Sequence, residues 1–161
     1  MSAAMTIHHA AIEWARDGAR FVDRRYSRAH AWRFDGGAVV PASSSPHVVR
    51  PPWSDPRAVD PEEAYVAALA SCHMLWFLDL AARAGFTVEC YRDAAEGRMA
   101  SDDDGHEWVA EVMLRPDVIF AGERVPDDAA VDALHHEAHI HCFLARSVRT
   151  AIATRGTWHR T

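Results

Sequence analysis

The chain has 161 residues and a formal net charge of −6 at pH 7. This charge argues against a nucleic-acid or anionic-membrane partner, because phosphate groups are bound by basic surfaces. The length predicts a single domain, 1–161, that buries its own core. Three cysteines, an odd number, argue against a disulfide scaffold and leave inert thiols, metal ligands or redox groups.

The N-terminal part, about 6–45, is predicted to be β-structure. Its first residues lack the long apolar segment of a secretory signal, which predicts a cytoplasmic protein. Segments 6–15 and 20–34 have strand character, and the Asp-Gly-Gly sequence that begins at Asp35 predicts a hairpin turn.

Alternation along the second of these segments places an arginine among aromatic side chains. With a two-residue period, Arg28 shares a face with Tyr26, His30, Trp32 and Phe34. A buried arginine needs an anionic partner, and a cysteine beside it would be held as the reactive thiolate. The same pattern also fits an edge strand from which Arg28 reaches solvent.

A Pro- and Ser-rich linker, 46–60, precedes a long helix predicted over 61–84. Asp60 can cap this helix, Pro61 suits its first position, and Gly85 ends it. The helix is apolar on nearly all sides, which predicts a central, buried position. Polar residues interrupt the apolar run, which we therefore expect to be too short and too polar to cross a bilayer.

A β-hairpin over 86–120, a second helix over 127–147 and a short C-terminal strand complete the prediction. Few crossovers of the βαβ kind are present in this order of elements. The sequence therefore predicts an α+β protein whose two long helices pack against antiparallel sheet.

Cys72 and Cys142 occupy matching positions, each near the middle of a predicted helix. Small neighbouring residues leave room for a close helix approach or for a small ligand. Each cysteine taken alone is more often a core residue than a reactive one. For Cys90, on the predicted hairpin, the interpretation as a core residue is favoured more strongly.

Four histidines lie on the second helix: His135, His136, His139 and His141. The spacing of His135 and His139 could hold a metal ion. The zinc-protease motif, however, needs a glutamate directly after the first histidine of such a pair, and here that position is His136. A solvated or interface cluster is favoured, with a metal site formed by these histidines and Cys142 as the alternative.

The sequence "VDPEEAYVAALASCHM", followed about seventy residues later by "HCFLARSV", resembles the OsmC/Ohr family of thiol-dependent hydroperoxide reductases. The segments "YSRAHAWRFDGG", "PASSSP" and "LHHEAH" resemble an OsmC-like proteobacterial branch of it. The resemblance extends from about Trp14 to Thr150. It implies an OsmC-like fold, in which antiparallel sheets pack around two long central helices in an intertwined dimer.

The resemblance also implies the roles of individual residues. Cys72 matches the peroxidatic cysteine, and Cys142 matches the cysteine that resolves its sulfenic acid to a disulfide. Glu62 and Arg28 match the family's glutamate and arginine, with Arg25 as the alternative arginine. An external dithiol, for example of the lipoyl type, would then reduce the disulfide, and no cofactor is implied.

Apolar neighbours of Cys72, including Leu75 and Trp76, suit organic hydroperoxides better than hydrogen peroxide. We therefore expect these two side chains to bind substrate. Two other functions fit the same residues. One is a catalytically silent binding or structural protein of the same fold, and the other is a metal-binding protein.

The spacing of Glu62 and Cys72 bears on assembly. Ten residues of helix rise by about 15 Å and turn the two side chains roughly 80° apart, so one arginine cannot serve both on a straight helix. No glycine or proline breaks the apolar run between them. The sequence therefore predicts a two-fold homodimer in which each active site takes residues from both chains.

Overall fold

The computed structural model describes residues 5–161. The chain divides into two compact units, one that ends at Ala64 and one that comprises Tyr65–Thr161. The single domain expected over 1–161 therefore has two parts, and each is described by itself below.

The first unit contains a three-stranded antiparallel sheet in the order β1-β2-β3. Its strands are β1 (Ala10–Glu13), β2 (His30–Phe34) and β3 (Val39–Ala42). The predicted hairpin turn joins β2 to β3, and Gly37 adopts a φ of 87° there, a conformation that glycine reaches without strain. The Gly37 N–H donates to the carbonyl of Phe34 at 3.0 Å.

The strand predicted over 20–34 is wrong in its first ten residues, which form loop and turns instead. Arg24 has a φ of 62°, outside the extended region that a strand needs. The Asp23 carboxylate accepts a hydrogen bond from the N–H of Arg25 at 3.1 Å, a local turn that competes with strand pairing.

Helix α1 (Pro61–Arg83) agrees with the prediction to within one residue. Asp60 caps it, because its carboxylate accepts from the Glu63 N–H at 2.7 Å while the Glu63 side chain accepts from the Asp60 N–H at 3.1 Å. This reciprocal pair satisfies two backbone donors that the first turn leaves free. Gly85 follows the helix with a φ of 79°, the conformation that commonly ends helices.

The second unit contains two three-stranded sheets, β4-β7-β9 and β5-β6-β8. The predicted hairpin over 86–120 is divided into four strands: β4 (Thr87–Asp93), β5 (Glu96–Ser101), β6 (Glu107–Leu114) and β7 (Pro116–Ala121). At the division, the Asp93 carboxylate accepts from the Arg115 N–H at 2.7 Å, replacing a bond between strands. The pairs β4/β7 and β5/β6 are antiparallel, as expected.

The last part of the chain departs most from the prediction. Helix α2 (Asp128–His141) is shorter than the helix predicted over 127–147, and a short 3-10 helix, η1 (Ala145–Ser147), follows it. The tail forms two strands, β8 (Ala151–Thr154) and β9 (Thr157–Arg160), instead of one. They pair in parallel with β6 and β7, so the sheets are mixed rather than purely antiparallel.

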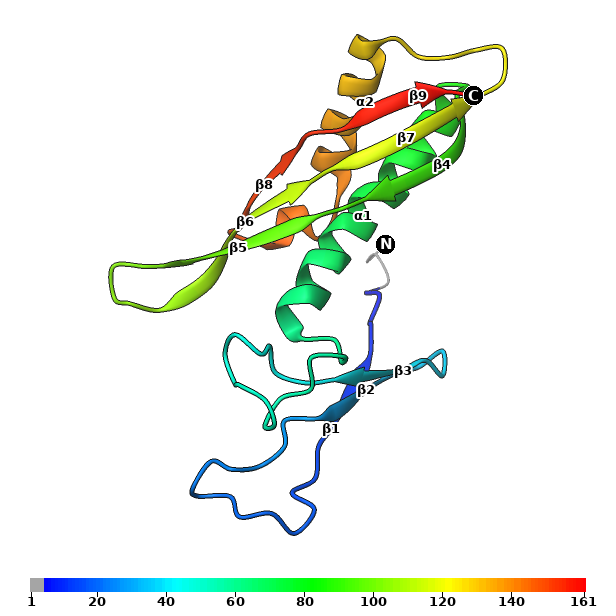
Figure 1. Cartoon of the computed structure of the whole chain (residues 1–161). Coiled ribbons are helices and arrows are strands. Elements are labelled where there is room, and N and C mark those ends of the chain that lie inside the picture. Colours follow the sequence, from blue (N-terminus) through cyan, green and yellow to red (C-terminus); the bar gives the residue numbers. More distant parts are fainter. Residues whose placement is uncertain (1–4) are drawn as a thin grey trace. The chain divides into compact units, whose positions relative to one another are not determined.

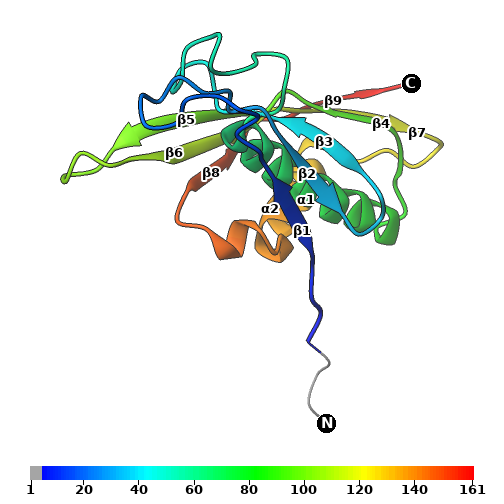
Figure 2. The same cartoon turned by 90° about the horizontal axis from the view of Figure 1, so that it is seen from below.

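In both views of the second unit, α1 and α2 lie against one face of the strands (Figures 1 and 2). The core between them is apolar: Phe77 of α1, Val118 and Phe120 of β7, and Leu134 and Ala138 of α2 are all buried. The burial of these side chains, each worth about 1.5–3 kcal/mol when large and apolar, fixes how the two helices pack on the sheet.

Helix α1 is more apolar than the sequence pattern indicated. The most apolar 18-residue stretch of this helix has a mean hydropathy of 1.4. By length and composition alone, the 23-residue helix could therefore cross a membrane. Core helices of soluble proteins meet the same two criteria, which therefore assign no location. Only 22% of that stretch is buried within the chain. Much of this apolar helix is therefore not covered by the rest of the same chain.

Candidate active site

Cys142 is the C-cap residue of α2, where the sequence had predicted the middle of a helix. Its φ of −63° and ψ of 113° are extended, while its N–H still donates to the carbonyl of Ala138. The chain turns directly after it, and the N–H of Ala145 donates to the Cys142 sulfur at 3.4 Å. The side chain is 1% exposed.

The structure brings Cys142 together with Cys72 of α1. The two thiols lie close enough for Cys72 to act on the pKa of Cys142, and both cysteines are free. Burial, followed by the neighbouring Cys72 thiol, raises the pKa of the Cys142 thiol to about 11. Cys142 is therefore protonated at neutral pH, although the N–H groups of Ala145 and Leu144 act in the opposite direction.

Cys72 is only partly buried and opens into a cavity of about 320 Å³. Leu75 and Trp76, the two residues predicted to bind substrate, line this cavity, together with Phe143. The Trp76 ring packs edge-on against Phe143 at 5.6 Å and stacks on His141 at 5.0 Å. The Arg83–Asp79 ion pair, 2.8 Å long, lies at the polar end of the cavity.

Arg28 and Glu62 lie together in the first unit, where both line a cavity of about 340 Å³. One carboxylate oxygen of Glu62, Oε2, is buried without a hydrogen-bond partner among the residues that the structure describes. Ile12, Trp14 and Tyr26 give this cavity apolar walls. A buried carboxylate oxygen without a partner can accept a hydrogen bond from a polar group that enters this cavity.

The guanidinium of Arg28 is held by its own loop. It donates to the carbonyl of Arg24 at 2.8 Å and to that of Tyr26, and it lies 3.8 Å from the centre of the Tyr26 ring. Within residues 5–161, no ion pair joins it to Glu62. Arg25, the alternative arginine, is exposed and does not line the cavity.

Cys90 lies on β4 and lines neither cavity. Its partly buried thiol agrees with the interpretation of a structural residue.

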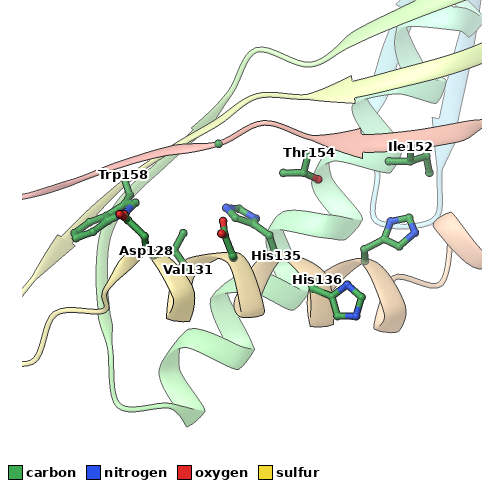
Figure 3. A pocket seen from close by; sticks show the side chains of 10 residues that line it. Asp128, Val131, His135, His136, Ile152, Thr154 and Trp158 are labelled. Carbon is green, nitrogen blue, oxygen red and sulfur yellow. The ribbon is translucent and has the colours of Figure 1, made fainter.

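The histidines of α2 do not converge on one point. His135 points from the helix toward the strand that carries Thr154, whereas His136 points away from it (Figure 3). Both line a cavity of about 540 Å³ in the second unit. In the described part of the chain, three candidate ligand atoms come within 4.8 Å of one another at Asp102, Asp104 and His106, in the β5–β6 turn, and not on α2.

His135 pairs with His73 of α1, a partner that the sequence analysis missed. Their rings are stacked with centres 5.3 Å apart, and both are buried. His73 follows Cys72 in sequence, so a polar pair in the core adjoins the candidate active cysteine. The presence of His73 in an apolar helix could have indicated a buried polar contact, but no sequence pattern pairs it with a residue of the other helix.

A model of one protein family, described as OsmC-like protein, matches residues 54–155. An OsmC-like protein of unknown function from Vibrio cholerae is 48% identical, with a TM-score of 0.92 over 94% of this chain and 99% of its own. No protein of curated function shows a significant sequence match.

More distant solved structures share the fold. An organic hydroperoxide resistance protein from Elizabethkingia anophelis has a TM-score of 0.66 at 12% identity, and the match covers 100% of both chains. The organic hydroperoxide resistance protein OhrB of Bacillus subtilis has a TM-score of 0.60 at 13% identity, over 96% of this chain and 98% of that one.

Proposed function

Because this chain belongs to the OsmC-like protein family, we propose that it is a cysteine-based peroxidase that reduces organic hydroperoxides to alcohols. The observation that carries the proposal is the proximity of Cys142 to Cys72, which lines an apolar cavity. The names of two solved relatives, which are organic hydroperoxide resistance proteins, support it.

The environments of the two thiols support different roles for them. A thiolate, not a thiol, attacks an electrophile, and the raised pKa of Cys142 keeps it protonated at neutral pH. Cys72 is the more accessible of the two and lines the cavity. Cys72 is therefore the peroxidatic cysteine, and Cys142 is the resolving one.

The reaction proceeds in two steps. The Cys72 thiolate attacks the distal oxygen of the hydroperoxide, the O–O bond breaks, and the alkoxide leaves and takes a proton to become the alcohol. The Cys72 sulfenic acid then condenses with the Cys142 thiol, which forms the disulfide and releases water. An external dithiol, such as a lipoyl-type dithiol of the cytoplasm, reduces the disulfide.

Leu75, Trp76 and Phe143 select the substrate. Their apolar side chains line the cavity beside Cys72 and favour a hydroperoxide with an apolar substituent, since burying apolar area contributes about 25 cal/mol per Å². Hydrogen peroxide has no such substituent to bury. Arg28 stabilises the charge that develops on the peroxide oxygen; Glu62, which lines the same cavity and within residues 5–161 makes no ion pair with Arg28, orients it in the assembled site of the proposed dimer.

The same proposal includes a two-fold homodimer in which the Cys72 of one chain meets Arg28 and Glu62 of the other. Exposed apolar side chains line the cavity beside Cys72: Leu75 is 60% exposed and Phe143 69%. A second copy of the chain is the partner proposed to pack at the edge of this cavity, which stays open to substrate and reductant, because exposed apolar surface of this kind marks interaction sites.

A steady-state assay tests the function. With dihydrolipoamide as the reductant, we expect a higher kcat/KM for cumene hydroperoxide and tert-butyl hydroperoxide than for hydrogen peroxide. Absence of turnover with all three peroxides, in protein that folds normally, would instead identify a silent binding protein of the same fold.

A further inference from the structure

The two sulfurs that form the proposed disulfide differ in access. Cys142 is 1% exposed, whereas Cys72 is partly exposed and opens into the cavity lined by Leu75, Trp76 and Phe143. Thiol–disulfide exchange needs the incoming thiolate to reach one sulfur while the other sulfur leaves. Access therefore determines which sulfur a reductant can attack.

Two backbone N–H groups can stabilise negative charge on the buried Cys142 sulfur. The N–H of Ala145 donates to the Cys142 sulfur at 3.4 Å, and the N–H of Leu144 also bonds to it. Hydrogen bonds from N–H groups stabilise an anionic acceptor more than a neutral one. These two groups therefore stabilise Cys142 as it leaves as a thiolate.

Leaving-group strength alone would favour the opposite direction. Burial raises the pKa of Cys142 to about 11, and a thiol of high pKa leaves more slowly. The raised pKa slows the release of Cys142 from the disulfide only by a limited factor. A sulfur that the reductant cannot reach is not attacked at all, so access outweighs the leaving group here.

We propose that the external reductant attacks Cys72, so that Cys142 is the first sulfur released; this inference rests on the proposed function. The reductant thiolate forms an S–S bond with Cys72, and the Cys72–Cys142 bond breaks with its electron pair going to Cys142. Cys142 takes up a proton. The second thiol of the reductant then attacks the reductant sulfur in the mixed disulfide, forms the reductant's own disulfide and releases the Cys72 thiolate.

Trapping the mixed disulfide tests this order. Cys90→Ser protein, which lacks the third thiol, is oxidised with diamide to the Cys72–Cys142 disulfide, treated with glutathione, quenched in acid, alkylated and digested with trypsin. Cleavage after arginine places the two remaining cysteines on different peptides, 58–83 and 125–146. We expect glutathione on the Cys72 peptide, in excess over the Cys142 peptide by about tenfold or more.

The same experiment in urea is the matched control. Both sulfurs are accessible in the unfolded chain, so glutathione should be found on the two peptides in similar amounts. Glutathione mainly on Cys142 in the folded protein, or equal labelling in the folded and unfolded states, would overturn the proposal. Since diamide forms the disulfide without a peroxide, the result is independent of whether hydroperoxides are substrates.

Discussion

His73 and His135 share a hydrogen bond in the core, with Nε2 of His73 3.0 Å from Nδ1 of His135. The pair links α1 to α2 across 62 residues of sequence. Within the described residues, the other nitrogen of each ring is buried without a partner. Burial lowers the pKa of both histidines to about 4, so both are neutral at pH 7.

This pair predicts a loss of stability in weak acid. In the unfolded chain each histidine titrates near 6.5, whereas in the folded chain it titrates at about 4. The native state is therefore fully stabilised above pH 6.5 and loses stability as the pH falls toward 4, by up to about 3 kcal/mol per histidine. Urea unfolding at about pH 7.5 and pH 4.5 measures this difference.

Substitution of both histidines identifies the source of the pH effect. His73→Leu combined with His135→Leu should remove most of the pH dependence in this window, while His136→Asn, at an exposed position of the same helix, should leave it intact. Equal pH dependence in the double variant and in the wild type would show that other groups cause it.

The cysteine variants should separate the two chemical steps. Cys72→Ser removes the nucleophile and should abolish turnover. Cys142→Ser should consume one equivalent of peroxide and then over-oxidise at Cys72, because no thiol resolves the sulfenic acid. Cys90→Ser is the control and should retain full activity, as measured by peroxide consumption and by intact mass. Substantial turnover by Cys72→Ser would contradict the assignment.

Arg28 and Arg25 form a matched pair for testing the arginine. Arg28 lines a cavity with Glu62, whereas Arg25 is exposed. Arg28→Ala should lower kcat/KM for cumene hydroperoxide by about 10²- to 10³-fold, the usual effect of removing one group that stabilises developing charge. Arg25→Ala should change it by less than about twofold. The opposite order of effects would make Arg25 the active-site arginine.

The proposed dimer depends on the apolar side chains around Cys72. A charge at Phe143, which is 69% exposed and lines the cavity with Cys72, would be buried without a partner in the interface. Phe143→Asp should therefore halve the mass measured by light scattering. Val48→Asp changes a residue that is equally exposed, at 68%, but outside that cavity, and should leave the mass unchanged.

Shared active sites make a second measurement of the dimer possible. When Cys72→Ser and Arg28→Ala proteins are mixed and allowed to exchange subunits, each heterodimer contains one intact site, so part of the activity should return. A wild-type protein that is monomeric and fully active at nanomolar concentration would exclude shared sites.

Features set by local chemistry were predictable from the sequence. The cap at Asp60, the helix end at Gly85 and the turn after Phe34 each depend on neighbouring residues. The matching mid-helix positions expected for Cys72 and Cys142 are only half confirmed, because Cys142 caps α2 rather than lying within a helix.

Features set by contacts between distant residues were not predictable. The division of the hairpin at Asp93 depends on a bond to Arg115, 22 residues away. β8 and β9 pair in parallel with β6 and β7, which precede α2 in the sequence. His73 and His135 likewise meet only because α1 and α2 pack on the same sheet, and no local pattern encodes such a contact.

One measurement tests the central claim, that Cys72 and Cys142 are a redox pair for organic hydroperoxides. Reduced protein is treated with one equivalent of cumene hydroperoxide, quenched in acid, alkylated and digested with trypsin. We predict one equivalent of the alcohol and a disulfide between peptides 58–83 and 125–146, with the cysteine of 84–92 alkylated. Unchanged hydroperoxide with all three cysteines alkylated would contradict the claim.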